Sequence, residues 1–492
     1  MKFFSRAWDS CQRMITSICS NFRKKAMVKT PVIETDLLKN IRPSLLSIKN
    51  FELENAFNLV AEDSVLHQTP SIVSYDDRGF NIKIFMEDLQ ILSEWNNSNS
   101  PLNSEVLHFS RGKKKFRALA VENRSKLQLS SPGIINLRTN HFQSLTNDHQ
   151  CYRQTIIRAR EKPNFHSFDG LSLNHNGKYS KDAMRISISG STYLLYLVSE
   201  IGGERCLIVI ESEQKTGAQQ YNKVYNSILL ALGLISGNLY WGEHYNLTSD
   251  DNAFVRINSI EFRNLAKESI SNLYLIKSAA YKSSLDEEDS KSKKIYISVN
   301  EFSKICQDIL DKENMNRSVL LLLEVNSSNF NVLRCAIYSI GIETMINLIY
   351  KEKKTATKPI HDSKLSRNLV FDLLKSLDQY TNDLDQNTMA VLKARINNIN
   401  SPTNLDRTIA AFEMLDLPLV ADDLTCLKSR NKFLHGATPF KARTTEDEIE
   451  VKFTTMRLHY LLSALILKYT GYSGHIYKRA IVNMDEGVFC EI

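Results

Sequence analysis

The chain has 492 residues, 42% hydrophobic and 24% charged, as in an ordinary soluble globular protein of two to four domains. No apolar run approaches the roughly 18–20 residues of a membrane span, and the sequence predicts a cytoplasmic protein that does not enter a membrane. The eight cysteines lack a C-x-x-C pair and the eleven histidines lack paired ligand spacing. We therefore expect reduced thiols, no metal and no cofactor.

The first segment, residues 1–30, predicts a basic amphipathic helix. Seven basic residues against Asp9 give it a net charge of +6, so the rest of the chain carries about +1 of the total of +7. Apolar residues step by three and four along it: Phe4, Trp8, Cys11, Ile15, Ile18 and Phe22. Three interpretations are open: docking on the protein itself, contact with a partner, or binding to an anionic membrane surface.

Residues 31–282 predict a strand-rich α+β domain. Apolar and polar residues alternate over 80–86, 185–189 and 252–261, as in half-buried strands. Segments 192–199 and 205–211 predict a hairpin of buried strands. Helical spacing over 219–235 ends at Gly237.

Residues 283–294 are almost free of apolar side chains and predict a linker. After a strand-like piece at 295–299, nearly all of 295–492 has helical periodicity. The predicted helices are 301–325, 330–351, 364–380, 387–397, 404–415, 420–435 and 448–470. The predicted fold class is therefore α+β, with a strand-rich N-terminal domain followed by an all-α helical bundle.

One of these helices carries the most informative motif of the chain, R-N-x-x-x-H, formed by Arg430, Asn431 and His435 before Gly436. Arginine keeps its charge and its planar fork suits a phosphate, while histidine moves protons near neutral pH. On a helix, Asn431 and His435 share a face and Arg430 lies one step round. This set fits metal-independent cleavage of RNA. The alternative is a surface arginine near a structurally satisfied histidine, since short motifs recur by chance.

A late helix with this motif in a C-terminal bundle resembles the HEPN superfamily of ribonucleases, and its Apea-like branch in overall layout. Glu343, on the apolar segment 336–348, supports the resemblance. The resemblance implies a homodimer whose two motifs share one cleft. It implies that His435 is the general base or acid, that Arg430 binds the scissile phosphate, and that Asn431 orients His435 or contacts the phosphate.

The same resemblance implies attack by the ribose 2′-OH, leaving a 2′,3′-cyclic phosphate and a 5′-OH. Lys428 and Lys432 are candidate contacts to the RNA backbone. The expected role is antiviral defence by abortive infection, with RNA (tRNA among the candidates) as substrate. A phage-derived or nucleotide trigger would act at the N-terminal domain. The alternative is a catalytically inactive helical scaffold that binds RNA or a protein.

Two rival sites remain. Glu211, Glu213 and Lys215 follow an apolar strand and, with Asp182, match the metal-binding half of a Mg²⁺-dependent PD-(D/E)xK nuclease. The basic run 111–117 fits either a phosphate backbone or a solvated loop.

Overall fold

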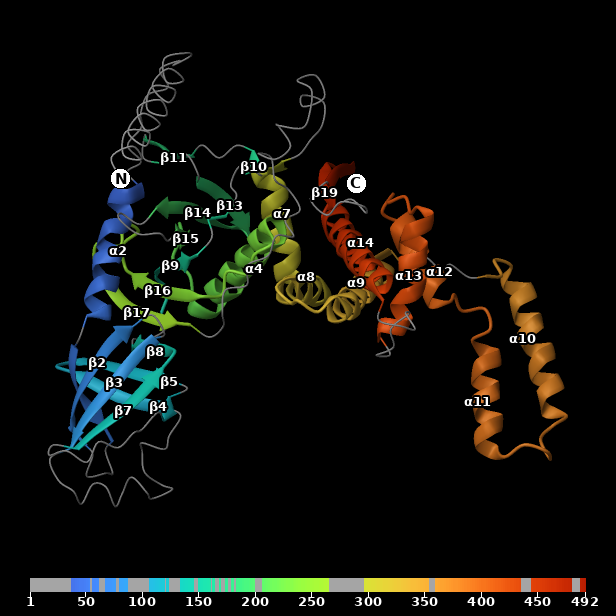
Figure 1. The fold of residues 1–492 in the computed structure, drawn as a ribbon, viewed down its shortest axis with the longest axis horizontal. Coiled ribbons are helices and arrows are strands. Elements are labelled where there is room, and N and C mark those ends of the chain that lie inside the picture. The colour runs from blue at the N-terminus through green and yellow to red at the C-terminus, as the bar shows by residue number, and fades with distance from the viewer. Residues whose placement is uncertain are drawn as a thin grey trace, which may run out of the picture.

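The computed structural model describes residues 37–53, 55–61, 67–76, 79–86, 106–119, 121–123, 133–145, 149–160, 162–163, 168–169, 173–175, 178–180, 183–199, 206–264, 296–353, 359–434, 444–479 and 487–492. The predicted N-terminal amphipathic helix and the predicted linker 283–294 lie outside these residues. In the described part, a strand-rich N-terminal region is followed by a helical C-terminal region (Figure 1). The α+β fold class is thus confirmed.

The N-terminal region is built on one large sheet, preceded by helix α2 (Leu37–Glu52). Its strand order is β13-β14-β15-β9-β16-β17-β8-β5-β4-β1-β2-β3-β7-β6, with every neighbouring pair antiparallel. The strands are β1 (Asn55–Val60), β2 (Pro70–Asp76), β3 (Gly79–Met86), β4 (Val106–Arg111), β5 (Lys114–Leu119), β6 (Glu122–Asn123), β7 (Gly133–Thr139), β8 (His141–Ser144), β9 (Tyr152–Ala159), β13 (Ala183–Ile188), β14 (Ser191–Ser199), β15 (Cys206–Ser212), β16 (Glu243–Ser249) and β17 (Ile257–Arg263).

Three smaller ladders accompany this sheet. They pair β10 (Phe168–Asp169) with β18 (Ile297–Ser298), β11 (Leu173–His175) with β12 (Lys178–Ser180), and β19 (His475–Arg479) with β20 (Gly487–Glu491). The β19–β20 pair lies in the C-terminal region, so the prediction that this region is all-α was wrong there.

The predicted strands 80–86 and 185–189 and the predicted hairpin are confirmed as β3, β13 and the antiparallel pair β14–β15. The prediction for 252–261 was wrong over its first half. There Asp251 Oδ1 accepts hydrogen bonds from the backbone nitrogens of Ala253 (3.0 Å) and Val255 (3.1 Å). This carboxylate stabilises a turn, and β17 begins only at Ile257.

Strands β9, β14 and β15 are buried on both faces, which explains their nearly continuous apolar sequence. Ile208 and Ile210 belong to a core shared with the helices, whereas Leu207 and Val209 face a second core. The second core lies inside the N-terminal region and contains Ile41 of α2. An edge-to-face phenylalanine cluster fills it, with Phe57 and Phe116 ring centroids 4.9 Å apart.

The predicted helical segments are present with small changes of their ends, except that 301–325 forms two helices instead of one. They are α4 (Ala218–Ser236), α7 (Val299–Asp311), α8 (Glu313–Asn326), α9 (Asn331–Lys353), α10 (Ser363–Asp378), α11 (Gln386–Asn397), α12 (Asn404–Glu413), α13 (Ala421–Leu434) and α14 (Thr445–Tyr469). The predicted single helix 301–325 was wrong, because Lys312 has extended backbone angles and separates α7 from α8. The predicted strand 295–299 is only β18, because Ser298 caps α7 in a capping box with Glu301.

The core shared with the helices joins the two regions. α7 packs on β13 and α4, and α8 packs on α4 and α9 (Figure 1). α9 contacts α12, α13 and α14. Among the described helices, α9 alone is long and apolar enough to cross a membrane by composition, over Asn331–Glu352, and half of that stretch is buried. This burial is compatible with a soluble protein.

Candidate active site

The motif helix α13 is attached to the bundle by a buried ion pair at its first turn. Arg457 of α14 donates to Asp423 Oδ1 at 2.8 Å, and both side chains are buried. Asp423 Oδ2 also accepts from the backbone nitrogen of Val420 at 3.0 Å. Acidic side chains at a helix start are favoured by the helix dipole, and the pairing with Arg457 orients α13 on α14.

Arg430 lies on the buried face of α13. Cys426, Leu427 and Phe433 form this face, and Arg430 is only 3% exposed. The spacing of three and four residues puts its side chain in the same stripe as these apolar groups. The sequence predicts that Arg430 binds a phosphate, but in this conformation the protein covers its guanidinium.

The charge of Arg430 is poorly compensated. Within the described residues its Nη1 has no hydrogen-bond partner, and no carboxylate lies within ion-pair distance. Burial lowers the pKa of Arg430; the charge of Glu343 on α9 raises it, and that of Arg407 on α12 lowers it. A buried cation without a close counter-ion is costly, so such a group is a candidate for binding an anion.

The cationic neighbour Arg407 of α12 makes its own contacts with α9. Its Nη2 donates to Asn347 Oδ1 at 2.9 Å, and its guanidinium carbon lies 5.2 Å from the centroid of the Tyr350 ring. Glu343, noted in the sequence, is thus the carboxylate of α9 whose charge acts on Arg430. The sequence did not reveal Arg407, because it is remote in the chain from the motif.

The other motif residues are placed only in part. α13 ends at Leu434, so His435 and Gly436 lie outside the described residues, as does the side chain of Asn431. Lys428 and Lys432 are exposed and four residues apart on one side of α13. They are therefore accessible to a phosphate backbone.

The rival carboxylates at the end of β15 and just after it bind other groups of the protein. Glu211 is buried, accepting from Gln154 Nε2 (2.8 Å) and the Tyr196 hydroxyl (2.9 Å), and burial raises its pKa. Glu213 forms two hydrogen bonds with Arg185, at 2.8 and 2.9 Å. The described residues contain no group of three His, Cys, Asp or Glu side chains able to hold a metal, and Asp182 lies outside them.

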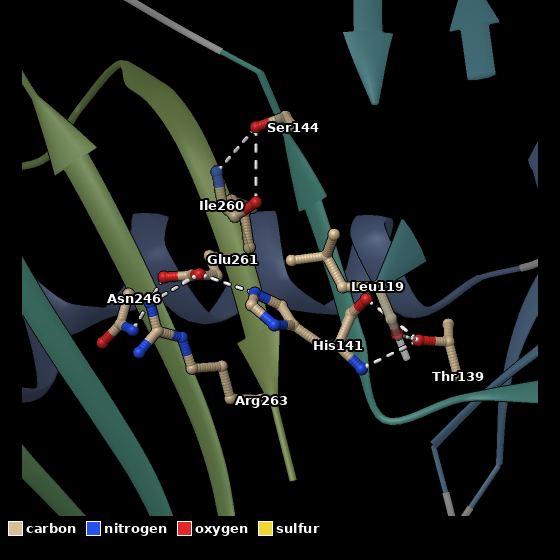
Figure 2. Close-up of polar contacts among 8 residues, drawn as sticks. All are labelled: Leu119, Thr139, His141, Ser144, Asn246, Ile260, Glu261 and Arg263. Carbon is tan, nitrogen blue, oxygen red and sulfur yellow. Dashed lines mark hydrogen bonds and ion pairs between the residues drawn. The ribbon is translucent and has the colours of Figure 1, made fainter. Parts of the chain in front are cut away.

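A polar cluster that the sequence analysis missed lies between β8, β16 and β17. Figure 2 shows Glu261 approached by three side chains: His141 Nε2 at 2.7 Å, Asn246 Nδ2 at 3.1 Å and Arg263 Nη2 at 2.8 Å. Burial raises the pKa of Glu261, but the His141 hydrogen bond and the charge of Arg263 outweigh it and hold the value at about 2. The strand register places Asn246 opposite Glu261 and Arg263 opposite His141, which no single strand reveals.

The predicted basic run lies on the β4–β5 hairpin, whose turn uses Gly112 with a φ of +59°. Arg111, Lys113 and Lys114 line a cavity of about 630 Å³ beside Phe51 and Phe57. Arg117, at the end of the run, lines a separate cavity. The run is thus not a plain solvated loop. Its basic side chains do not form one continuous strip either, because Arg117 lines a different cavity from the other three.

No family model, curated protein or solved structure matches the chain.

Proposed function

We propose that the chain is a metal-independent HEPN endoribonuclease whose site is built on α13. The observation that carries the proposal is Arg430: a buried guanidinium without a close counter-ion, five residues before His435. Its planar fork suits two oxygens of a scissile phosphate. The exposed Lys428 and Lys432 would hold flanking phosphates of the RNA.

In this mechanism His435 takes the proton of a ribose 2′-OH or gives a proton to the 5′-oxygen that leaves. Arg430 stabilises the negative charge that builds on the phosphate oxygens, and Asn431 orients His435 or contacts the phosphate. A homodimer would bring two copies of the motif to one cleft. DNA would be inert because it lacks the nucleophilic 2′-OH.

Because Arg430 is buried, we propose that the nuclease is regulated. At 3% exposure its guanidinium cannot reach a phosphate, so the conformation described here would be the inactive one. An activating signal would favour a conformation in which α13 and its neighbours expose Arg430. We assign this sensing role to the N-terminal region, in cytoplasmic antiviral defence by abortive infection with a phage-derived or nucleotide trigger.

The test is RNA cleavage by purified Arg430→Ala and His435→Ala proteins, with Arg395→Ala on the exposed face of α11 as a matched control. We expect both site variants to lose about 10²-fold or more of the activity, as when a general acid–base or an oxyanion-stabilising group is removed, and the control to keep it. Products should carry a 2′,3′-cyclic phosphate, and EDTA should have no effect. Circular dichroism checks that each variant is folded.

Unchanged cleavage by His435→Ala would refute this site. RNA binding without cleavage by any preparation would favour the alternative, an inactive scaffold. Cleavage that EDTA abolishes and Glu213→Ala removes would instead indicate the third function, a Mg²⁺-dependent nuclease in the N-terminal region.

A further inference from the structure

A polar cavity lies where the central sheet meets the start of α4. Its volume is about 390 Å³, within the usual range of roughly 300–1,000 Å³ for small-molecule sites. Its wall includes Arg117 of β5, Arg153 of β9, Arg263 of β17 and Tyr221 of α4. We call it the α4 cavity.

Positive charge predominates in this wall. Three arginines line the α4 cavity, whereas Glu261 is the one carboxylate among its described lining residues. Glu261 is already engaged by Arg263 at 2.8 Å and by His141 at 2.7 Å. Among the described residues, Glu261 thus pairs with His141 and Arg263 and not with Arg117.

Arg117 is the clearest unmatched charge. None of the described carboxylates forms an ion pair with it, and its hydrogen bonding goes to a neutral amide. In the orientation of the Gln143 amide that satisfies both neighbours, its oxygen accepts from Arg117 Nη2 at 2.6 Å and its nitrogen donates to Glu261 Oε1 at 2.8 Å. Gln143 therefore links Arg117 to the Glu261 cluster and orients the guanidinium.

The other arginines are also held in place before any ligand binds. Arg153 donates from Nε to the Thr216 carbonyl at 2.9 Å and from Nη2 to the His149 carbonyl at 3.3 Å. Glu261 fixes Arg263, as Figure 2 shows. Groups oriented in advance lose little conformational freedom on binding, which favours affinity.

We propose that the α4 cavity binds a small phosphorylated molecule of the nucleotide class, with Arg117 holding a phosphoryl group. A phosphoryl group presents the paired oxygens and the negative charge that a guanidinium fork recognises. Asn222, Thr248 and Ser259 in the same wall provide neutral hydrogen-bonding groups for the rest of such a ligand. The cavity is bounded by a helix and by strands from several parts of the chain, which suits a compact ligand more than an extended RNA strand.

The position of the cavity gives the ligand a route to the helical region. Ala218, Tyr221 and Asn222 of α4 line it, and α4 also packs against α7 and α8. A ligand that shifts the start of α4 would therefore act on a helix shared by both regions. This regulatory step rests on the proposed ribonuclease function, whereas the binding step does not.

The test is isothermal titration calorimetry of the full chain with AMP, ATP and adenosine, without RNA. We expect AMP and ATP to bind and adenosine to bind at least about tenfold more weakly, because it lacks the phosphoryl charge. Arg117→Gln should weaken the binding of AMP by about tenfold or more, and Arg117→Lys should restore only part of it. Lys115→Gln removes the same charge two residues away, outside the cavity, and should change affinity by less than about twofold.

Absence of binding by both AMP and ATP would overturn the proposal, and so would equal weakening by Lys115→Gln and Arg117→Gln. Preferential binding of a single-stranded RNA oligomer that is insensitive to Arg117→Gln would also overturn it. AMP binding that leaves RNA cleavage by an active protein unchanged would overturn only the regulatory step. Because calorimetry needs no nuclease activity, failure of the α13 site would not imitate any of these results.

Discussion

Arg430 shows what a residue type does and does not reveal. The motif predicts the charge and the fork of this arginine, and both hold for any conformation of the chain. Its burial depends on how the apolar face of α13 packs in the bundle, and its pKa depends on the charges of Glu343 of α9 and Arg407 of α12. The sequence therefore indicated the chemistry of the group but not its covered state.

The burial of a single residue, His244, predicts that the stability of the fold depends on pH. This histidine is buried on β16, its Nε2 lies 2.8 Å from the Tyr240 carbonyl, and burial lowers its pKa from 6.5 to about 4. The unfolded chain therefore binds a proton at His244 when the pH falls below about 6.5, whereas the folded chain does not bind it until the pH reaches about 4. Above pH about 6.5, His244 does not change the free energy of unfolding in this way. As the pH falls towards about 4, protonation of the unfolded chain lowers the free energy of unfolding by on the order of 3 kcal/mol in total.

The measurement is urea unfolding at several pH values between 7 and 4 for the wild type and His244→Gln. The loss of unfolding free energy on acidification should be smaller in the variant, which cannot be protonated. His108→Gln, an exposed histidine on β4, serves as the control and should keep the wild-type slope. Parallel curves for all three proteins would contradict the assignment to His244.

At the scale of elements, the hairpin of α10 and α11 differs from the rest of the bundle. Neither helix contains a buried residue, and the pair projects from the body of the molecule (Figure 1). Its apolar side chains remain accessible, with Phe371 66% and Leu365 57% exposed. The amphipathic spacing predicted these two helices correctly, yet it could not show that their apolar stripe meets so little of the protein.

Local unfolding of this hairpin should therefore be easy in a single chain, because most helical stability in proteins comes from tertiary packing. We expect backbone amides of α10 and α11 to exchange with deuterium at least about 10²-fold faster than those of α9 and α14. Hydrogen–deuterium exchange with mass spectrometry measures both sets in one experiment. Equal protection at low protein concentration would contradict the prediction.

At the scale of the whole molecule, the two regions meet closely at Gly233 of α4. A Cβ at this position would lie 2.7 Å from the Asn238 carbonyl oxygen and 2.8 Å from Leu323 Cδ1 of α8. A Cβ at Gly341 of α9 would likewise lie 2.6 Å from Leu462 Cδ2 of α14. The neighbour of Gly341 is the tip of a side chain, whereas Gly233 also meets backbone, which moves less easily.

Gly233→Ala should consequently lower the free energy of unfolding by about 1–3 kcal/mol, the usual cost of overpacking. Gly341→Ala should cost less, since Leu462 can change rotamer. Denaturant unfolding of both variants gives the comparison. A stabilised Gly233→Ala protein, as expected for an unobstructed helix position, would show that α4 and α8 are not in close contact in solution.

The elements were largely determined by the sequence alone, because hydrophobic periodicity and capping are properties of neighbouring residues. The alternation over β3 and β13 and the spacing of α4, α9 and α14 were sufficient to locate them. The break at Lys312 and the turn at Asp251 were not visible in this way, since each interrupts a pattern that continues in the sequence.

Only the tertiary structure decided which side chains meet. The α4 cavity combines Arg117, Arg153 and Arg263 from separate strands, and the charges of Glu343 and Arg407 act on Arg430 from two other helices. Strand register and helix packing bring these groups together, and both depend on burial across the whole core rather than on local pattern. The residue type determines the chemistry of each group, whereas the fold determines its partners and its exposure.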